Sequence, residues 1–192
     1  MTKKRISWYV PGKVVVAKDK MRRFIGKRSR YTYTLTARYG DIEFPAELSP
    51  RKMLEMGVFE GKYINDCTNE FPMEWYTNAK LSDAPDPSIN FFGVKSRSSF
   101  AQWLANGWIP AADDDEDARG WFQWYCRYYI GRRDPAADEV QIKRWRAFKR
   151  HKAQIVADIG RKHRDGKRVS KMAHRPKQRQ ALLQWAYDPL NM

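Results

Sequence analysis

Residues 120–131 form the densest aromatic segment of the chain, with the sequence GWFQWYCRYYIG. If this segment is helical, Trp121, Trp124, Tyr125 and Tyr128 fall on one side, because they are spaced at i, i+3, i+4 and i+7. A helical stripe of rings usually packs in a core, where each ring removes a large apolar area from water. The segment therefore predicts a buried helix; the alternative is a ring edge that stacks on an unpaired base.

The first third of the chain is predicted to be strand-rich. Residues 8–10 and 14–16 flank Pro11-Gly12, a turn dipeptide. Residues 31–38 are rich in aromatic and β-branched side chains, which favour strands.

The remainder of the chain is predicted to be helical. Ser49 and Pro50 provide an N-cap and a first helical residue for a helix that ends at Met56, before Gly57. Further helices are expected from Phe71-Pro72 to Lys80, from Ser98 or Ser99 to Gly107, over 138–159 and over 177–187, with a loop at 84–88. We therefore expect an α+β protein with short N-terminal strands and a mainly helical body. It would be one domain, with a strand-rich basic part at 1–45, a core at 46–159, a basic loop or arm at 160–176 and a closing helix at 177–188.

The net charge of the chain is informative about the partner of this protein and less informative about its fold. The chain has 37 Lys and Arg against 22 Asp and Glu, a net charge of +15. Residues 1–40 carry a net +11 and residues 121–192 a net +12, while residues 41–120 carry a net −8. Lys- and Arg-rich faces bind phosphate, so nucleic acid is the expected partner. An anionic membrane surface fits less well as the partner. Proteins that bind such a surface normally use one basic amphipathic helix with a clean apolar face, whereas here the basic residues are spread over both ends of the chain.

The compartment follows from what the sequence lacks. No run of 18 apolar residues could span a membrane, and no apolar stretch follows the basic N-terminus as in a signal peptide. Two cysteines, Cys67 and Cys126, make no disulfide framework, which fits a reducing compartment. We expect a cytoplasmic monomer that binds DNA and no membrane.

The segment YINDCTNEFP at 63–72 holds the best candidates for catalysis. Asp66 and Glu70 are four residues apart and share a face if the segment is helical. A carboxylate among Tyr, Asn and Thr donors could orient or deprotonate a water molecule. The alternatives are structural: Glu70 could cap the next helix, and Asp66 could pair with an arginine.

Polar residues near the aromatic segment could contact nucleic acid. Gln123 could read a base edge and Arg127 could hold a phosphate at two points. Arg132 and Arg133 follow Gly131 and would suit a phosphate clasp, or they could compensate the dipole of the helix C-terminus. The segment 53–62, with Gly57 and Gly61, is similar to a helix-hairpin-helix turn, in which backbone amides hold a phosphate.

Metal and nucleotide chemistry are not expected. The cysteines are far apart, and His151, His163 and His174 lie in basic surroundings without ligand spacing. The chain contains no Walker loop, no GxGxxG after a strand, no GxSxG and no zinc-deaminase signature. We expect no metal and no cofactor.

Several motifs together resemble a family of small basic, largely uncharacterised proteins of bacteria, phages and plants. The motifs are Asp66-Cys67 with Glu70-Phe71-Pro72, NFFGV at 90–94, GWFQWYCRYY at 120–129, GRR at 131–133, QIKRW at 141–145 and RQALLQWAY at 179–187. More loosely, the chain resembles DNA glycosylases that act on modified phage bases, including an anti-phage defence glycosylase.

The resemblance implies base flipping and hydrolysis of an N-glycosidic bond, without metal or cofactor. Asp66, with Glu70, would steady charge on the sugar and orient water. The base would be bound by Asn65, Trp75, Asn90, Phe92, Gln123 and Trp124. Phosphates would be held by Arg127, Arg132, Arg133, Lys143, Arg144, Arg175 and Arg179. The alternatives are a non-catalytic nucleic-acid-binding protein, a DNA-base-modifying transferase or an RNA-directed enzyme.

Overall fold

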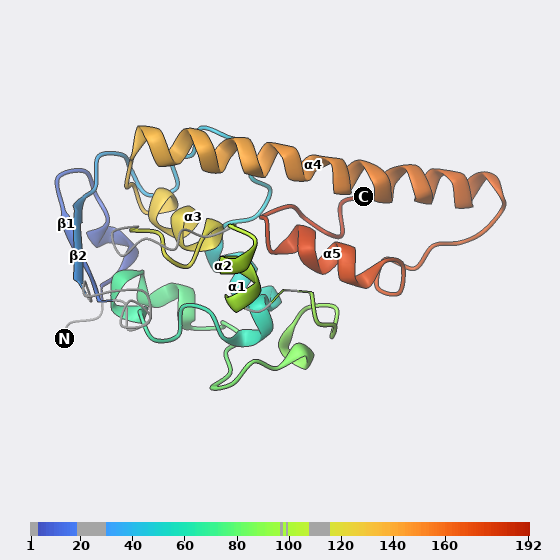
Figure 1. Ribbon diagram of the computed structural model, residues 1–192, viewed down its shortest axis with the longest axis horizontal. Coiled ribbons are helices and arrows are strands. Elements are labelled where there is room, and N and C mark those ends of the chain that lie inside the picture. The colour runs from blue at the N-terminus through green and yellow to red at the C-terminus, as the bar shows by residue number, and fades with distance from the viewer. Residues whose placement is uncertain (1–3, 19–29, 97, 99, 108–115) are drawn as a thin grey trace.

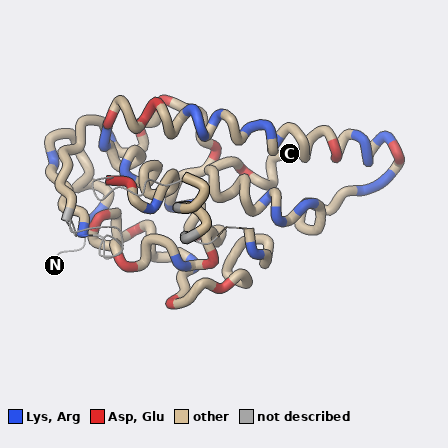
Figure 2. Tube along the Cα trace, viewed as in Figure 1, with Lys and Arg blue, Asp and Glu red and all other residues tan. Residues whose placement is uncertain are grey.

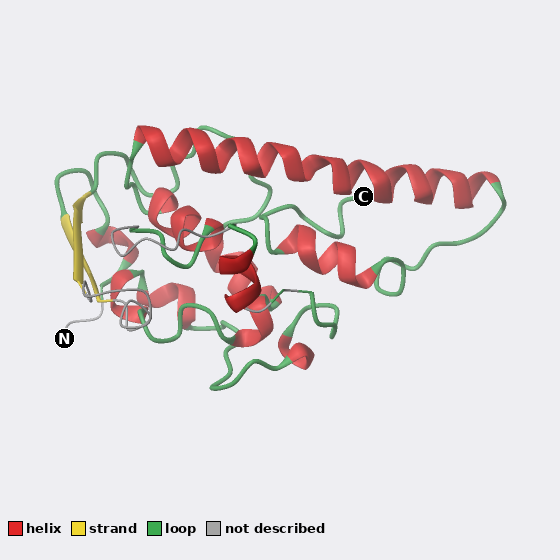
Figure 3. Cartoon of the chain, in the orientation of Figure 1, coloured by secondary structure: helices red, strands yellow, loops and turns green. Residues whose placement is uncertain are grey.

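The computed structural model describes residues 4–18, 30–96, 98, 100–107 and 116–192. A two-stranded sheet lies at one end, and the long helix α4 (Pro135–Arg164) runs from near it to the opposite end of the molecule (Figure 1). Helices α3 (Trp121–Tyr129) and α5 (Pro176–Leu183) lie along α4. Apart from the sheet, the described residues form helices, turns and loops (Figure 3). The predicted α+β fold with a mainly helical body is confirmed.

The sheet pairs β1 (Val14–Lys18) with β2 (Arg30–Thr34) in antiparallel register, with Val15 opposite Tyr33. The strand predicted over 31–38 ends at Thr34, because the amides of Thr36 and Ala37 both donate to the carbonyl of Gly131 instead of to a strand. The strand predicted over 8–10 is wrong. Residues Ile6–Trp8 form a 3-10 turn, η1.

Helix α1 (Pro50–Met56) has the predicted ends. The Ser49 hydroxyl accepts a hydrogen bond from the amide of Lys52 at 3.2 Å, as an N-cap does. Gly57 ends the helix at a φ of 104°, and a Cβ there would lie 2.1 Å from the carbonyl oxygen of Ile89. The position therefore requires glycine for both its dihedral angle and its close contact.

The helix predicted over 72–80 is wrong. Between α1 and Asn90 the chain makes only short 3-10 turns. These are η3 (Phe59–Gly61), η4 (Thr68–Glu70), η5 (Met73–Tyr76) and η6 (Pro87–Ile89), the last of which overlaps the loop predicted at 84–88. The amide of Lys80, which would bond within such a helix, donates instead to the carbonyl of Leu54. The next predicted helix is confirmed as α2 (Phe100–Ala105); Ser99, one of its two expected caps, lies outside the described residues.

Helix α4 is longer at both ends than the predicted 138–159. It begins at Pro135, where the Asp134 side chain accepts from the amide of Ala137 at 3.2 Å. It continues past Gly160, because an interior glycine costs only about 1 kcal/mol. Cationic residues in its last turn also favour the C-terminal dipole. The predicted basic arm is therefore shorter, and the α4–α5 loop comprises residues 165–175. The closing helix also ends early, at Leu183.

The aromatic stripe is buried, as predicted. The side chains of Trp121, Trp124, Tyr125 and Tyr128 are between 0 and 6 % exposed. The opposite side of α3 is buried too, including Cys126, and burial raises the pKa of that thiol. Cys67 and Cys126 are both buried and are not joined in a disulfide, so neither presents a reactive thiolate at the surface. Helix α3 is thus a core element, in which Trp124, Tyr125 and Tyr128 do not reach a surface.

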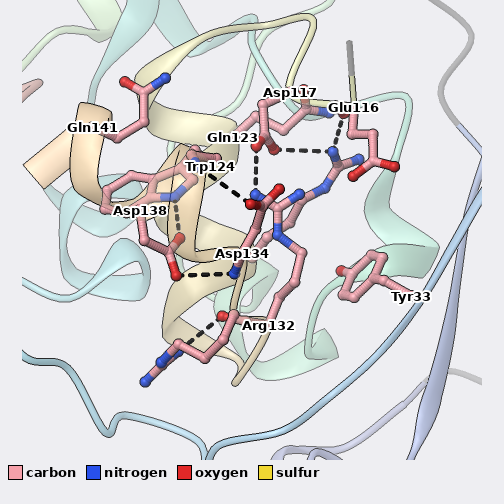
Figure 4. Close-up of polar contacts among 12 residues, drawn as sticks. Tyr33, Glu116, Asp117, Gln123, Trp124, Arg132, Asp134, Asp138 and Gln141 are labelled. Atoms are coloured by element: carbon pink, nitrogen blue, oxygen red, sulfur yellow. Dashed lines mark hydrogen bonds and ion pairs between the residues drawn. The ribbon is translucent and has the colours of Figure 1, made fainter. Parts of the chain in front are cut away.

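A buried ion-pair cluster joins α3 to the rest of the core. The Nε of Arg127 lies 2.5 Å from Glu70, and another nitrogen of the same guanidinium lies 3.0 Å from Asp117. The Tyr33 hydroxyl of β2 donates to Glu70 at 2.8 Å, and Arg132 donates to the far oxygen of Asp117. Figure 4 places Asp117, Arg132 and Tyr33 around this cluster. The sequence predicted either a catalytic role or a helix cap for Glu70, and neither prediction anticipated this cluster. The Glu70 carboxylate is fully buried against the guanidinium of Arg127.

Removal of the central arginine should destabilise the protein strongly. Arg127→Met would leave the Glu70 carboxylate buried without its counter-ion, which typically costs about 3–5 kcal/mol. We expect the free energy of unfolding, measured by urea titration with tryptophan fluorescence, to fall by about that amount. The matched control is Arg51→Met, which breaks a partly exposed ion pair with Glu55 and should cost less than about 1 kcal/mol. Equal losses in the two variants would contradict the structural role of Arg127.

Candidate nucleic-acid interface

Most residues predicted to bind a base are part of the interior. Trp75, Phe92, Gln123 and Trp124 are buried. The indole of Trp124 donates to Asp138 at 2.7 Å (Figure 4), and that of Trp75 donates to the hydroxyl of Tyr39 at 2.8 Å. The side chain of Gln123 accepts from the amide of Arg119 at 3.1 Å. These groups have structural partners and do not face a surface from which a base could enter.

The two predicted asparagines brace loops. The amide of Asn65 donates to the carbonyls of Gly61 and Ser82. Asn90 is buried; it accepts from the amide of Glu60 at 2.8 Å and donates to the carbonyl of Val94. The amide of Glu60 is thereby occupied, so the 53–62 turn does not offer it to a phosphate, and no second helix follows that turn.

The predicted phosphate-binding residues divide into two groups. Arg127, Arg132 and Arg179 are at most 2 % exposed, and their guanidinium groups bond to carboxylates or to backbone carbonyls. They do not reach a ligand on the surface. Arg133 is partly buried and lies over the ring of Tyr128 at 3.8 Å, donating to nearby carbonyls. Lys143 and Arg175 are exposed, and Arg144 is partly exposed.

Asp66 is more accessible than Glu70. Its side chain is 38 % exposed and accepts from the guanidinium of Arg119 at 2.7 Å, the arginine pairing that the sequence offered as an alternative. Arg119 also donates to the carbonyl of Tyr63, and the Tyr63 hydroxyl donates back to the carbonyl of Arg119. Asp66 and Glu70 therefore do not act as a pair: one lies at the surface and the other in the core.

The chain contains a pocket of about 490 Å³ between α3, α4, α5 and the 59–63 segment. Its size falls in the usual range for ligand sites. Seven aromatic residues contribute to its lining: Phe59, Tyr63, Trp103, Trp121, Phe122, Phe148 and Trp185. Arg119, Arg144 and Arg150 also line it. Asp66 lies next to this pocket through its bond to Arg119.

The outer face of α4 carries a row of cations, of which the sequence analysis assigned only Lys143 to phosphate binding. Residues 140–164 contain nine Lys and Arg and a single acidic residue, Asp158. Five exposed cations recur at spacings that return to the same side of a helix with 3.6 residues per turn. We call them the α4 stripe: Lys143, Arg146, Arg150, Arg161 and Arg164. Figure 2 shows Lys and Arg recurring along this helix and around the turn toward α5. The helical period was the signal that could have identified them.

The α4–α5 loop extends the stripe and is fixed by one carboxylate. Asp158 accepts from His174 at 2.7 Å, from Arg175 at 2.9 Å and from Arg161. These bonds, that of His174 foremost, hold the pKa of Asp158 well below its ordinary value. The carboxylate is thus charged at neutral pH, and its contribution weakens only as the pH falls below the ordinary range of a carboxyl. A cleft of about 850 Å³ lies beside it, lined in part by Lys162, Lys167 and Arg168.

In the described part of the chain, no three His, Cys, Asp or Glu side chains come together as metal ligands would. Among the same residues, no helix combines the length and apolar character needed to cross a membrane.

The Asp158 cluster yields a test of the loop. Asp158→Asn removes the charge that holds His174, Arg175 and Arg161, so the loop should open more often. We expect trypsin to cleave after Lys167, Arg168 or Lys171 about tenfold faster or more than in the wild type, as loss of a charge-assisted hydrogen bond would allow. Asp165→Asn changes a residue in the same loop but outside the cluster, and trypsin should cleave this variant at the wild-type rate. Similar cleavage rates in the two variants would refute this role of Asp158.

Comparisons of the chain with protein-family models, with curated proteins and with solved structures found no match, so its site has to be interpreted from its own geometry.

Proposed function

We propose that this protein binds nucleic acid, with the α4 stripe and the α4–α5 loop contacting phosphates. The observation that carries the proposal is the row of exposed cations on one face of a 30-residue helix. Exposed Lys167, Arg168 and Lys171 continue it in the loop. A cationic stripe along a helix is the electrostatic footprint expected for a phosphate backbone.

The length of the helix suits such a ligand. Arg164 follows Lys143 by 21 positions, so the stripe is about 32 Å long at 1.5 Å per residue. Each strand of a duplex carries one phosphate about every 3.4 Å, so several phosphates lie within reach of the stripe. Each contact releases condensed counter-ions, and affinity should therefore fall steeply with salt.

A second candidate function is hydrolysis of an N-glycosidic bond in DNA. Its specific support is Asp66, an exposed carboxylate held by an arginine that lines the aromatic pocket. Such a carboxylate could stabilise positive charge on a sugar and orient water. The sequence resemblance makes a modified base in phage DNA the substrate to test first, with anti-phage defence as the biological setting.

Neutralising the loop should lower both affinity and its salt dependence. In Lys167→Gln/Arg168→Gln/Lys171→Gln, up to three phosphate contacts are lost. The slope of log K against log salt should become shallower by about 0.9 per lost contact on duplex DNA. Fluorescence anisotropy at several salt concentrations measures this slope. The control Lys13→Gln/Arg38→Gln/Lys80→Gln removes the same charge from exposed sites outside α4 and the loop. If the slope changed equally in the two variants, the effect would depend on net charge alone, which would contradict the proposed interface.

Asp66→Asn separates catalysis from binding. A glycosylase should lose about 10²–10⁴-fold in turnover, the range for one acid–base group, while DNA affinity stays within about twofold. The assay measures released base and alkali-labile abasic sites on unmodified, hydroxymethylated and glucosylated DNA. Asp83→Asn, also at an exposed aspartate, is the control and should keep its activity. If the wild type yields no product on any of these DNAs, glycosylase activity is refuted and the binding proposal is unaffected.

A further inference from the structure

The aromatic pocket and the α4 stripe share a residue. Arg150 lines the pocket and also belongs to the row of exposed cations on α4. We propose that the pocket receives one unpaired nucleobase from a strand whose phosphates lie on that row. This inference rests on the proposed function and adds to it the class of substrate: nucleic acid with a base that is unpaired or easily extruded.

The lining is suited to a flat ring. Two groups of rings border the pocket. In the first, Phe59 lies 4.5 Å from Tyr63 and 5.0 Å from Phe122 between ring centroids. In the second, Trp185 stacks on Phe148 at 4.8 Å and lies 4.9 Å from Trp121. Aromatic faces bind any of the four bases by stacking, because every base presents a π-face.

The charges at the pocket favour a nucleotide over a neutral apolar ligand. Arg119, Arg144 and Arg150 contribute to the lining, and no Asp or Glu is among the described residues that line it. The guanidinium of Arg144 lies 6.0 Å from the ring centroid of Trp185, so cation and ring belong to one wall. Aromatic stacking combined with a positively charged groove is how proteins bind single-stranded nucleic acid.

One polar side chain is positioned among these rings. The amide oxygen of Gln184 accepts from the backbone amide of Phe59 at 3.3 Å and from the Ser96 hydroxyl at 3.1 Å. These bonds fix a glutamine at the wall of an otherwise largely aromatic site. The side-chain nitrogen of Gln184 also donates to the carbonyl of Ser96 at 3.4 Å, so this residue holds the wall of the pocket in place.

The spacing of pocket and cleft gives a minimum ligand length. Phe148 lines the pocket and Lys162 lines the cleft beside the α4–α5 loop, and the 14 residues between them span about 21 Å. That distance corresponds to about six base pairs at 3.4 Å each. An oligonucleotide shorter than this should occupy one region and not both.

The experiment fills the pocket without disturbing the core. Ala147 is exposed on α4 and lines the pocket, so Ala147→Trp should occupy it. Ala153→Trp places the same ring at an exposed position of the same helix that does not line the pocket. The probes are a 16-base-pair DNA duplex with one bulged 2-aminopurine, its fully paired counterpart and the same two molecules in RNA.

The wild type should bind the bulged probe more tightly than the paired one by about 5- to 150-fold, the range for one stacked base. Fluorescence of 2-aminopurine should fall on binding, because stacking on a ring quenches it. Ala147→Trp should abolish both effects and keep its affinity for the paired duplex within about twofold, and Ala153→Trp should retain both.

Three results would overturn the inference. Equal affinity of the wild type for bulged and paired probes, in DNA and RNA alike, would show that the pocket takes no base, while the binding proposal survives. In a second outcome, Ala147→Trp would still bind the bulged probe more tightly than the paired one but would no longer bind anilinonaphthalene-sulfonate. This result would assign the pocket to an apolar small molecule. Failure of the wild type to bind any probe at low salt would refute the proposed function itself.

Discussion

The burial of Arg127 is the constraint on which the fold depends. This side chain is 1 % exposed, and its guanidinium is held by Glu70, from the chain before it, and by Asp117, just ahead of α3. A buried guanidinium is tolerable only when its donors are satisfied by well-placed acceptors, since the desolvation penalty is several kcal/mol per ion. The two carboxylates have to be brought from segments 57 and 10 residues away. Closure of the core and satisfaction of this ion therefore occur together, and Tyr33 adds the sheet to the same cluster.

This arrangement explains why the positive charge of the chain is not all available for binding. Arg119, Arg127, Arg132 and Arg179 are at most 5 % exposed and have internal partners. The acidic middle of the sequence supplies three of those partners, Asp66, Glu70 and Asp117. Among the described residues, the exposed cations are concentrated on α4, which runs away from the sheet, and on the loop after it (Figure 2). Charge neutralised inside the protein thus leaves a localised cationic surface rather than a uniform one.

The sequence predicted features that depend on local chemistry. The caps and glycine of α1 and the buried stripe of α3 follow from neighbouring residues, and both are confirmed. It did not predict which arginines are internal, because Arg127 and Arg150 look alike until the fold places a carboxylate beside one of them. The pocket was missed for a similar reason. Its rings come from segments as distant as Phe59 and Trp185, whereas the rings predicted to bind a base, Trp75 and Trp124, lie in the core. Tertiary hydrogen bonds also replaced the helix predicted after Pro72.

Asp66 and Glu70, which the sequence analysis grouped because they are four residues apart, lie in different environments. Glu70 is committed to a buried cation, so protonating or removing it would disturb the core before it affected any reaction. Asp66 is exposed and interacts with Arg119, whose other bonds fix the Tyr63 segment at the pocket wall. A change at Asp66 can thus reach the pocket without reaching the core. If a base enters that pocket, Asp66 is a carboxylate that Arg119 holds beside the pocket wall.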